Sequence, residues 1–162
     1  MICIAFMMIG INTFAQNLDL AAIRKDFNKG VKDEELCKQR IKLLEKYDDI
    51  PEAKGYEAVF RMFMAKHSGN PLKKMSYFNS GKNILEKQIK ANPSNTELRF
   101  IRLCVQYYIP AFLGYKDNIP QDKTFLIDNL YKMKDTSVKS IIYNHLKGAK
   151  MFTEKELELL GR

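Results

Sequence analysis

Two arginines one helical turn apart are the residues of this chain best suited to chemistry. In the stretch NTELRFIRLCVQYY, polar residues recur at spacings of four, three and four: Asn95, Arg99, Arg102 and Gln106. These spacings place them on one stripe of a helix that is otherwise almost entirely apolar. Paired guanidinium groups grip carboxylate or phosphate through parallel hydrogen bonds, so the stripe could form an anion pocket.

The same arginines also have a structural interpretation, which we favour. A charge on an otherwise buried helix needs a partner, because an unpaired buried charge is expensive. Carboxylates that could neutralise the pair follow soon after the stretch: Asp117, Asp122 and Asp128. Closed ion pairs would favour this interpretation, whereas free guanidiniums facing a cavity would favour a pocket.

Aromatic residues gather at the end of the same helix. Pro110 stops the helix and Gly114 permits a tight turn. Such a bend usually plugs one end of a helical core, and the alternative is a groove in which tyrosine offers a wide contact surface with a polar tip. The aromatic cluster consists of Tyr107, Tyr108, Phe112 and Tyr115. The candidate binding residues are therefore Arg99, Arg102, Gln106, Tyr107, Tyr108 and Tyr115.

Other patterns that carry chemistry are missing from the sequence. His67 and His145 stand on apolar helical faces without metal-ligand spacing, so we expect core or boundary histidines. No C-x-x-C, G-x-S-x-G or glycine-rich phosphate loop occurs. Ser94 and Glu97 have capping-box spacing, which favours a structural cap over a catalytic acid for Glu97. We therefore expect no catalytic residue, no metal and no cofactor, and we lean against an enzyme.

The first fifteen residues, MICIAFMMIGINTFA, carry no charge and form an apolar run too short to span a bilayer. Thr13 and Ala15 are small residues at the positions that signal peptidase reads, so residues 1–15 are expected to be a signal peptide. Export to the periplasm or cell envelope follows, with no membrane span in the mature chain. The alternative is a buried N-terminal helix. Cys37 and Cys104 occupy apolar helical positions, which favours two separate buried thiols over a disulfide.

The net charge of +8 does not by itself indicate a nucleic-acid partner. The lysines are scattered over several expected helices and often stand beside acids, as in KDEELCKQR. No basic block or nucleic-acid motif occurs, so we expect no nucleic acid among the partners. Weak attraction to an anionic envelope surface is compatible with the charge.

Helical periodicity dominates residues 16–162, and no segment alternates with period two. We expect one all-α domain of seven to eight amphipathic helices joined by short turns, which pack as antiparallel pairs. The first helix is expected near Leu18 to Lys29, ending at Gly30. Later starts carry cap or proline signals: Asp33, Pro51, Asn70 with Pro71, Pro120, Asp135 or Thr136, and Thr153 with Glu156.

Two glycines and one apolar stripe refine this expectation. Gly69 can end a helix in the left-handed conformation. Gly81 lies inside the next helix, where it costs roughly 1 kcal/mol relative to alanine, so a close helix crossing is the simplest reason for it. The stripe expected to face the core of that helix consists of Met75, Phe78, Leu85 and Ile89.

The stretch ILEKQIKANPSNTEL resembles the junction between two tetratricopeptide repeats, with a helix, then Asn-Pro-x-Asn, then a new helix. The resemblance covers roughly Gly55 to Tyr108, without the usual Trp and Leu-Gly positions of the repeat and without a second copy 34 residues away. The chain also resembles small exported helical proteins that have a similar ELRFIRL helix and FLGY turn. These resemblances imply a tetratricopeptide-like helical array that binds another envelope protein. The alternative is a small anionic-ligand binder or enzyme that uses Arg99, Arg102 and the tyrosines.

Overall fold

The computed structural model describes residues 18–162, and the expected signal peptide lies outside the described residues. Residues 18–162 form eight α-helices, three short 3-10 helices and no strand, which confirms the all-α prediction and the expected number of helices. The α-helices are α1 (Leu20–Asp26), α2 (Glu34–Leu44), α3 (Pro51–His67), α4 (Pro71–Ala91), α5 (Thr96–Tyr108), α6 (Ile119–Asn129), α7 (Thr136–Gly148) and α8 (Glu154–Leu160). The 3-10 helices are η1 (Lys29–Val31), η2 (Ala111–Leu113) and η3 (Leu130–Lys132).

Most helix starts follow their predicted caps. The side chain of Asn70 accepts hydrogen bonds from the amides of Leu72 and Lys73, at 2.9 and 3.1 Å. Asp33 and Asp135 cap α2 and α7 in the same way. The capping box predicted at the start of α8 is present. Local side-chain chemistry therefore determines where these helices begin.

Two predicted helix boundaries are wrong. The residue after α3 is Ser68 in an extended conformation, and Gly69 does not adopt the left-handed conformation that we expected. The first helix ends at Asp26 rather than at Lys29. The Asp26 carboxylate there binds the ammonium of Lys29 and the guanidinium of Arg40 on α2, so the chain turns into η1 at this point.

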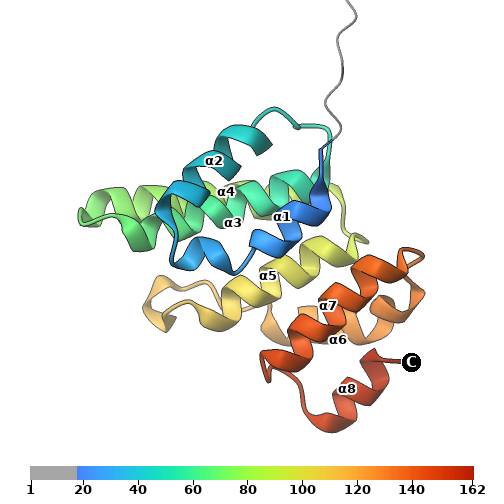
Figure 1. Cartoon of the computed structure of the whole chain (residues 1–162). Coiled ribbons are helices and arrows are strands. Elements are labelled where there is room, and N and C mark those ends of the chain that lie inside the picture. Colours follow the sequence, from blue (N-terminus) through green and yellow to red (C-terminus); the bar gives the residue numbers. More distant parts are fainter. Residues whose placement is uncertain (1–17) are drawn as a thin grey trace, which may run out of the picture.

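Helices α3 and α4 form a hairpin and pack along each other, joined only by residues 68–70 (Figure 1). A Cβ atom added at Gly81 would lie 2.3 Å from the carbonyl oxygen of Ala58 on α3, so the backbones touch at this crossing. The close approach predicted for Gly81 is therefore confirmed. Helix α2 packs against α3, and α8 packs against α6.

Helix α5 lies between α3 and α6 and is buried on nearly all sides (Figure 1). Its side chains Leu98, Ile101 and Leu103 are fully buried, as the almost entirely apolar sequence predicted. The expected stripe of α4 is confirmed at three positions and wrong at the fourth. Met75 is exposed, because the first turns of α4 extend beyond the core.

Both described cysteines are buried and unpaired, which confirms the prediction of two separate thiols. Burial raises the pKa of the Cys37 thiol to about 11 and raises that of Cys104 well above its ordinary value. Both thiols are thus protonated and unreactive near neutral pH. Among residues 18–162, no helix combines the length and the apolar character needed to cross a bilayer.

Candidate functional site

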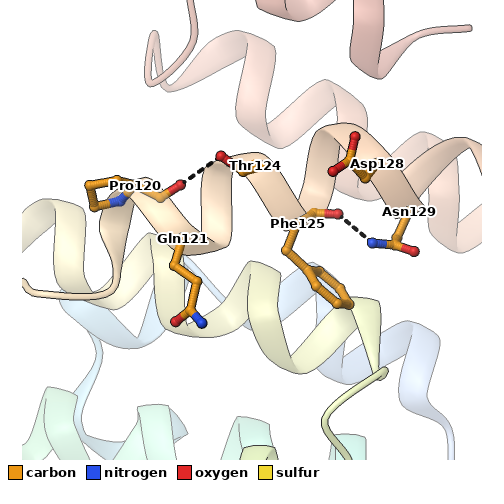
Figure 2. Close-up of a pocket in the computed structure, with 6 residues that line it drawn as sticks. All are labelled: Pro120, Gln121, Thr124, Phe125, Asp128 and Asn129. Atoms are coloured by element: carbon orange, nitrogen blue, oxygen red, sulfur yellow. Dashed lines mark hydrogen bonds between the residues drawn. The ribbon is translucent and has the colours of Figure 1, made fainter.

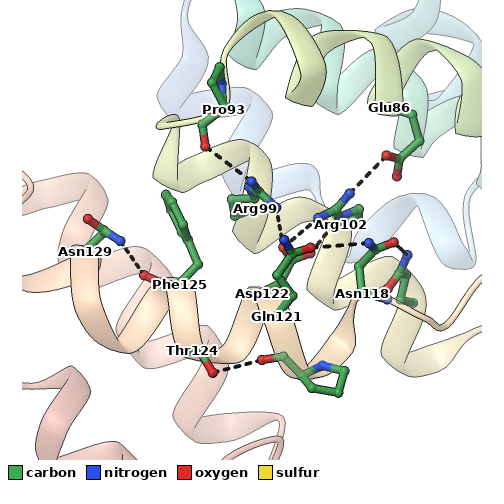
Figure 3. A network of polar contacts seen from close by, with 12 residues as sticks. Glu86, Pro93, Arg99, Arg102, Asn118, Gln121, Asp122, Thr124, Phe125 and Asn129 are labelled. Carbon is green, nitrogen blue, oxygen red and sulfur yellow. Dashed lines mark hydrogen bonds and ion pairs between the residues drawn. The ribbon is translucent and has the colours of Figure 1, made fainter.

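The predicted arginine stripe forms a buried ion-pair network with α6 and α4 (Figure 3). Arg102 donates from Nε and Nη2 to the two carboxylate oxygens of Asp122, at 2.7 Å each. Its Nη1 donates to Glu86 on α4 at 3.0 Å. Arg102 is 3% exposed and Asp122 is 0% exposed, so the pair is shielded from water. Burial alone would lower the pKa of Arg102, but the hydrogen bonds and charge of Asp122 outweigh it and raise that pKa.

Arg99 is neutralised by the same carboxylate. Its Nη1 donates to Asp122 at 3.0 Å, and its Nη2 donates to the carbonyl of Pro93 at 3.4 Å (Figure 3). The guanidinium also lies 4.9 Å from the centre of the Phe125 ring, a cation–π distance. Both arginines are thus in closed ion pairs, and one of the three expected carboxylates, Asp122, is the partner of both. This geometry favours the structural interpretation of the stripe over the anion pocket.

Two more of the predicted residues hold the loop at residues 109–118. Gln106 is fully buried. Its Nε2 donates to Oδ1 of Asn118 at 3.0 Å, and its Oε1 accepts from the backbone N–H of Asn118 at 3.2 Å. The Tyr115 hydroxyl donates to Glu86, the carboxylate that also binds Arg102. Gly114 adopts φ +58, the left-handed conformation that the tight turn predicted. The network therefore fixes both the helix pair and the loop that follows α5.

This loop forms one rim of an apolar groove with a volume of about 1110 Å³. The remaining walls are the C-terminal ends of α1, α3, α5 and α7, the segment around η1 and the N-terminal half of α4. The apolar lining side chains include Phe27, Val31, Met62, Phe63, Ala65, Met75, Phe78, Val105, Tyr108, Ile109, Phe112 and Leu113. Because segments from across the described chain meet here, the groove exists only in the folded protein.

Two aromatic side chains stand out from the rim of the groove. Phe112 is 86% exposed and Tyr108 is 63% exposed. Large apolar side chains that remain in water beside an apolar hollow are typical of an interaction surface. Tyr107 is 38% exposed, stacks edge-on against Tyr108 at 5.3 Å between ring centres, and does not line the groove. Of the six predicted binding residues, only Tyr108 therefore faces the groove directly.

His145 on α7 forms part of the groove wall. Its ring packs against Phe27 at 5.5 Å and Phe100 at 5.1 Å, measured between ring centres. Asn28 lies at hydrogen-bond range, with its Nδ2 3.5 Å from His145 Nδ1. Burial lowers the pKa of His145 below its ordinary value of 6.5, so the ring is neutral at neutral pH. These contacts agree with the prediction of a core or boundary histidine. His67 also agrees with it, because its Nε2 lies 2.8 Å from the carbonyl oxygen of Gly30.

A second hollow of about 480 Å³ lies over α6 (Figure 2). All of the residues that line it belong to this one helix. Two of its polar side chains satisfy neighbouring backbone carbonyls, with Thr124 donating to Pro120 and Asn129 to Phe125 (Figure 2). Within the described part of the chain, no polar groups from other elements converge on this hollow, so it has little of the character of a binding site.

Glu97 is not the helix cap that its spacing suggested. Asn95 caps α5 by accepting from the amide of Leu98 at 3.0 Å. Glu97 instead accepts two hydrogen bonds from Arg24 on α1, at 2.7 and 2.8 Å, and one from the hydroxyl of Tyr56, at 2.8 Å. The carboxylate is buried and ties α1 to α5, a long-range role that the capping pattern could not reveal.

The sequence interpretation missed most of the groove. Met75 was expected to face the core, whereas it is exposed and lines the hollow together with Phe63. One sequence feature did indicate the groove. A groove was the alternative interpretation of the aromatic bend that contains Phe112. A second signal was available in the sequence Leu72-Lys73-Lys74-Met75, where two lysines stand between two apolar residues at the start of α4.

No group of three or more potential metal-ligating side chains is present between residues 18 and 162. Comparisons with protein-family models, with curated proteins and with solved structures each found no significant match. The groove and the ion-pair network that holds its rim are therefore the features of the molecule that indicate a function.

Proposed function

We propose that this chain is a binding module that takes an apolar helical segment of another protein into the groove. The observation that carries the proposal is the exposed pair Phe112 and Tyr108 beside the apolar hollow. Side chains that protrude this far cannot be covered by a small molecule lying inside the groove. A protein segment can cover both the hollow and its rim, as in helix-in-groove recognition.

The composition of the walls supports this choice. Met62 and Met75 contribute flexible thioethers, which adapt to differently shaped apolar partners. The described residues contain no strand, so no sheet edge is present there to which an extended partner could be added. A helix with an apolar face fits a trough whose walls are themselves helices.

The proposal extends to the setting of the module. We place it in the periplasm or cell envelope, exported by residues 1–15, with an envelope protein as partner. The antiparallel helices form a tetratricopeptide-like array in this account, in which successive helix pairs build the binding surface. N-terminal sequencing of the mature protein tests the export step. A chain that begins at Gln16 supports it, and a chain that retains Met1 opposes it.

Two exposed apolar residues allow a matched test of the groove itself. Phe112 lines the groove, whereas Leu72 is 82% exposed but does not line it. The probe is a fluorescent amphipathic peptide of about 18 residues, or five helical turns, with a Leu-rich face and a glutamine-rich polar face. We expect Phe112→Ser to weaken peptide binding by roughly tenfold or more, as for an aromatic anchor, and Leu72→Ser to change it little. Equal effects of the two substitutions, or no binding by the wild type, would contradict the proposal.

A further inference from the structure

The charged side chains of the described residues that line the groove are all positive. Among residues 18–162, the lining of the groove includes three lysines and no carboxylate. Lys32 follows η1, Lys66 lies near the end of α3 and Lys74 lies near the start of α4, so three separate elements bring these cations to one mouth. We call these three residues the lysine rim.

The lysine rim differs from several other lysines of the chain. Lys29 and Lys54 are held by carboxylates at 2.8 and 2.7 Å. All three members of the rim are exposed, and none makes an ion pair with another residue of the described chain. Their charges are therefore not neutralised by described carboxylates, and their aliphatic stems border the apolar wall.

We propose that the segment bound in the groove is an acidic amphipathic helix. Its apolar face packs on the groove wall and around Phe112, and its flanking aspartates or glutamates pair with the lysine rim. This inference rests on the proposed function and adds the charge of the partner. Charge complementarity of this kind selects partners and speeds their association, because like-charged segments are repelled.

Three versions of the peptide probe test the charge of the partner. All share the Leu-rich face, and their flanking polar residues are glutamate, glutamine or lysine. We expect the glutamate peptide to bind roughly tenfold more tightly than the glutamine peptide, and the lysine peptide to bind most weakly. The differences should shrink between about 50 mM and about 500 mM salt, because the contacts are exposed and screened.

Two triple variants localise the effect. K32Q/K66Q/K74Q should remove the preference for the glutamate peptide. K90Q/K134Q/K155Q removes the same number of exposed charges away from the groove and should keep the preference. Loss of the preference in both variants would show that net charge, and not the lysine rim, is responsible, and would overturn the inference.

The remaining outcomes separate this inference from the proposed function. If all three peptides bind equally well and Phe112→Ser weakens them all, the charge inference fails and the groove function stands. If no peptide binds, both fail. Binding to phosphatidylglycerol vesicles that exceeds peptide binding and requires the lysine rim would overturn the inference in favour of a membrane surface. A dimer in sedimentation that Phe112→Ser dissociates would overturn it in favour of a second copy of the chain.

Discussion

Arg102 on α5 and Asp122 on α6 form a two-pronged ion pair in which both donor–acceptor distances are 2.7 Å and both side chains are buried. The pair joins two helices that are separated in sequence by the whole loop that borders the groove. Without Arg102, the buried Asp122 keeps, among the described ion pairs, only its single contact with Arg99, and breaking a buried ion pair typically costs about 3 to 5 kcal/mol.

We therefore predict that Arg102→Ala lowers the free energy of unfolding by about 3 to 5 kcal/mol, measured from denaturant midpoints. The double variant with Asp122→Ala should lose less than the sum of the two single losses, because Arg102 and Asp122 stabilise each other directly. Lys90→Ala, at an exposed position of α4, serves as the control and should have little effect. A midpoint of Arg102→Ala at or above that of the wild type would contradict the structural role of the pair.

One conservative substitution at Glu97 distinguishes its two interpretations, as a helix cap and as the ion-pair partner of Arg24. Glutamine replaces glutamate readily in a capping box, so Glu97→Gln would be nearly neutral if Glu97 were a cap. In the structure Glu97 binds Arg24 with both oxygens, and the substitution leaves a largely buried guanidinium without its counter-charge. We predict a loss of roughly 3 kcal/mol for Glu97→Gln. Glu156→Gln, in the true capping box of α8, is the control and should cost less than about 1 kcal/mol.

Most helix starts, α5 excepted, could be predicted from sequence because they depend on neighbouring residues. Asn70, Asp135 and Thr153 cap amides two or three positions ahead, and this chemistry is visible in the sequence. The end of α1 could not be predicted in this way. It depends on the contact of Asp26 with Arg40, which lies on another helix.

The candidate site was predictable only in part for the same reason. The need of Arg102 for a carboxylate followed from its position on an apolar helix, and Asp122 was among the three carboxylates considered. The groove, by contrast, requires α1, α3, α4, α5 and α7 to meet. Helical periodicity shows that a side chain such as Met75 is on an apolar face, but not whether another element covers that face.

Gly81 and Gly148 form a matched pair of helical glycines. A Cβ at Gly81 would collide with the backbone of Ala58, whereas a Cβ at Gly148 would meet nothing within 4 Å. We predict that Gly81→Ala lowers the free energy of unfolding despite the better helix propensity of alanine. Gly148→Ala should raise it by about 0.5 to 1 kcal/mol. Thermal unfolding of the two variants checks both signs, and a stabilised Gly81→Ala variant would rule out the close crossing.

His145 predicts a pH dependence of stability. Because burial lowers its pKa in the folded protein, the unfolded chain takes up a proton at a higher pH than the folded chain does. The contribution of neutral His145 is complete above its unfolded pKa of about 6.5 and declines as the pH falls below that value. We predict that lowering the pH from about 8 to about 5 reduces the unfolding free energy of the wild type relative to that of His145→Gln. A difference that stays constant over this range would contradict the assignment.

Binding in the groove can be observed most directly through the methionine methyl groups. Met62 and Met75 line the groove, whereas Met133 and Met151 lie elsewhere in the fold and serve as internal references. With methyl-labelled methionine, titration of the glutamate-flanked peptide should shift the NMR signals of Met62 and Met75 and leave those of Met133 and Met151 in place. The shifts should weaken in Phe112→Ser at the same peptide concentration. Unchanged Met62 and Met75 signals at saturating peptide, or shifts confined to Met133 and Met151, would contradict the account.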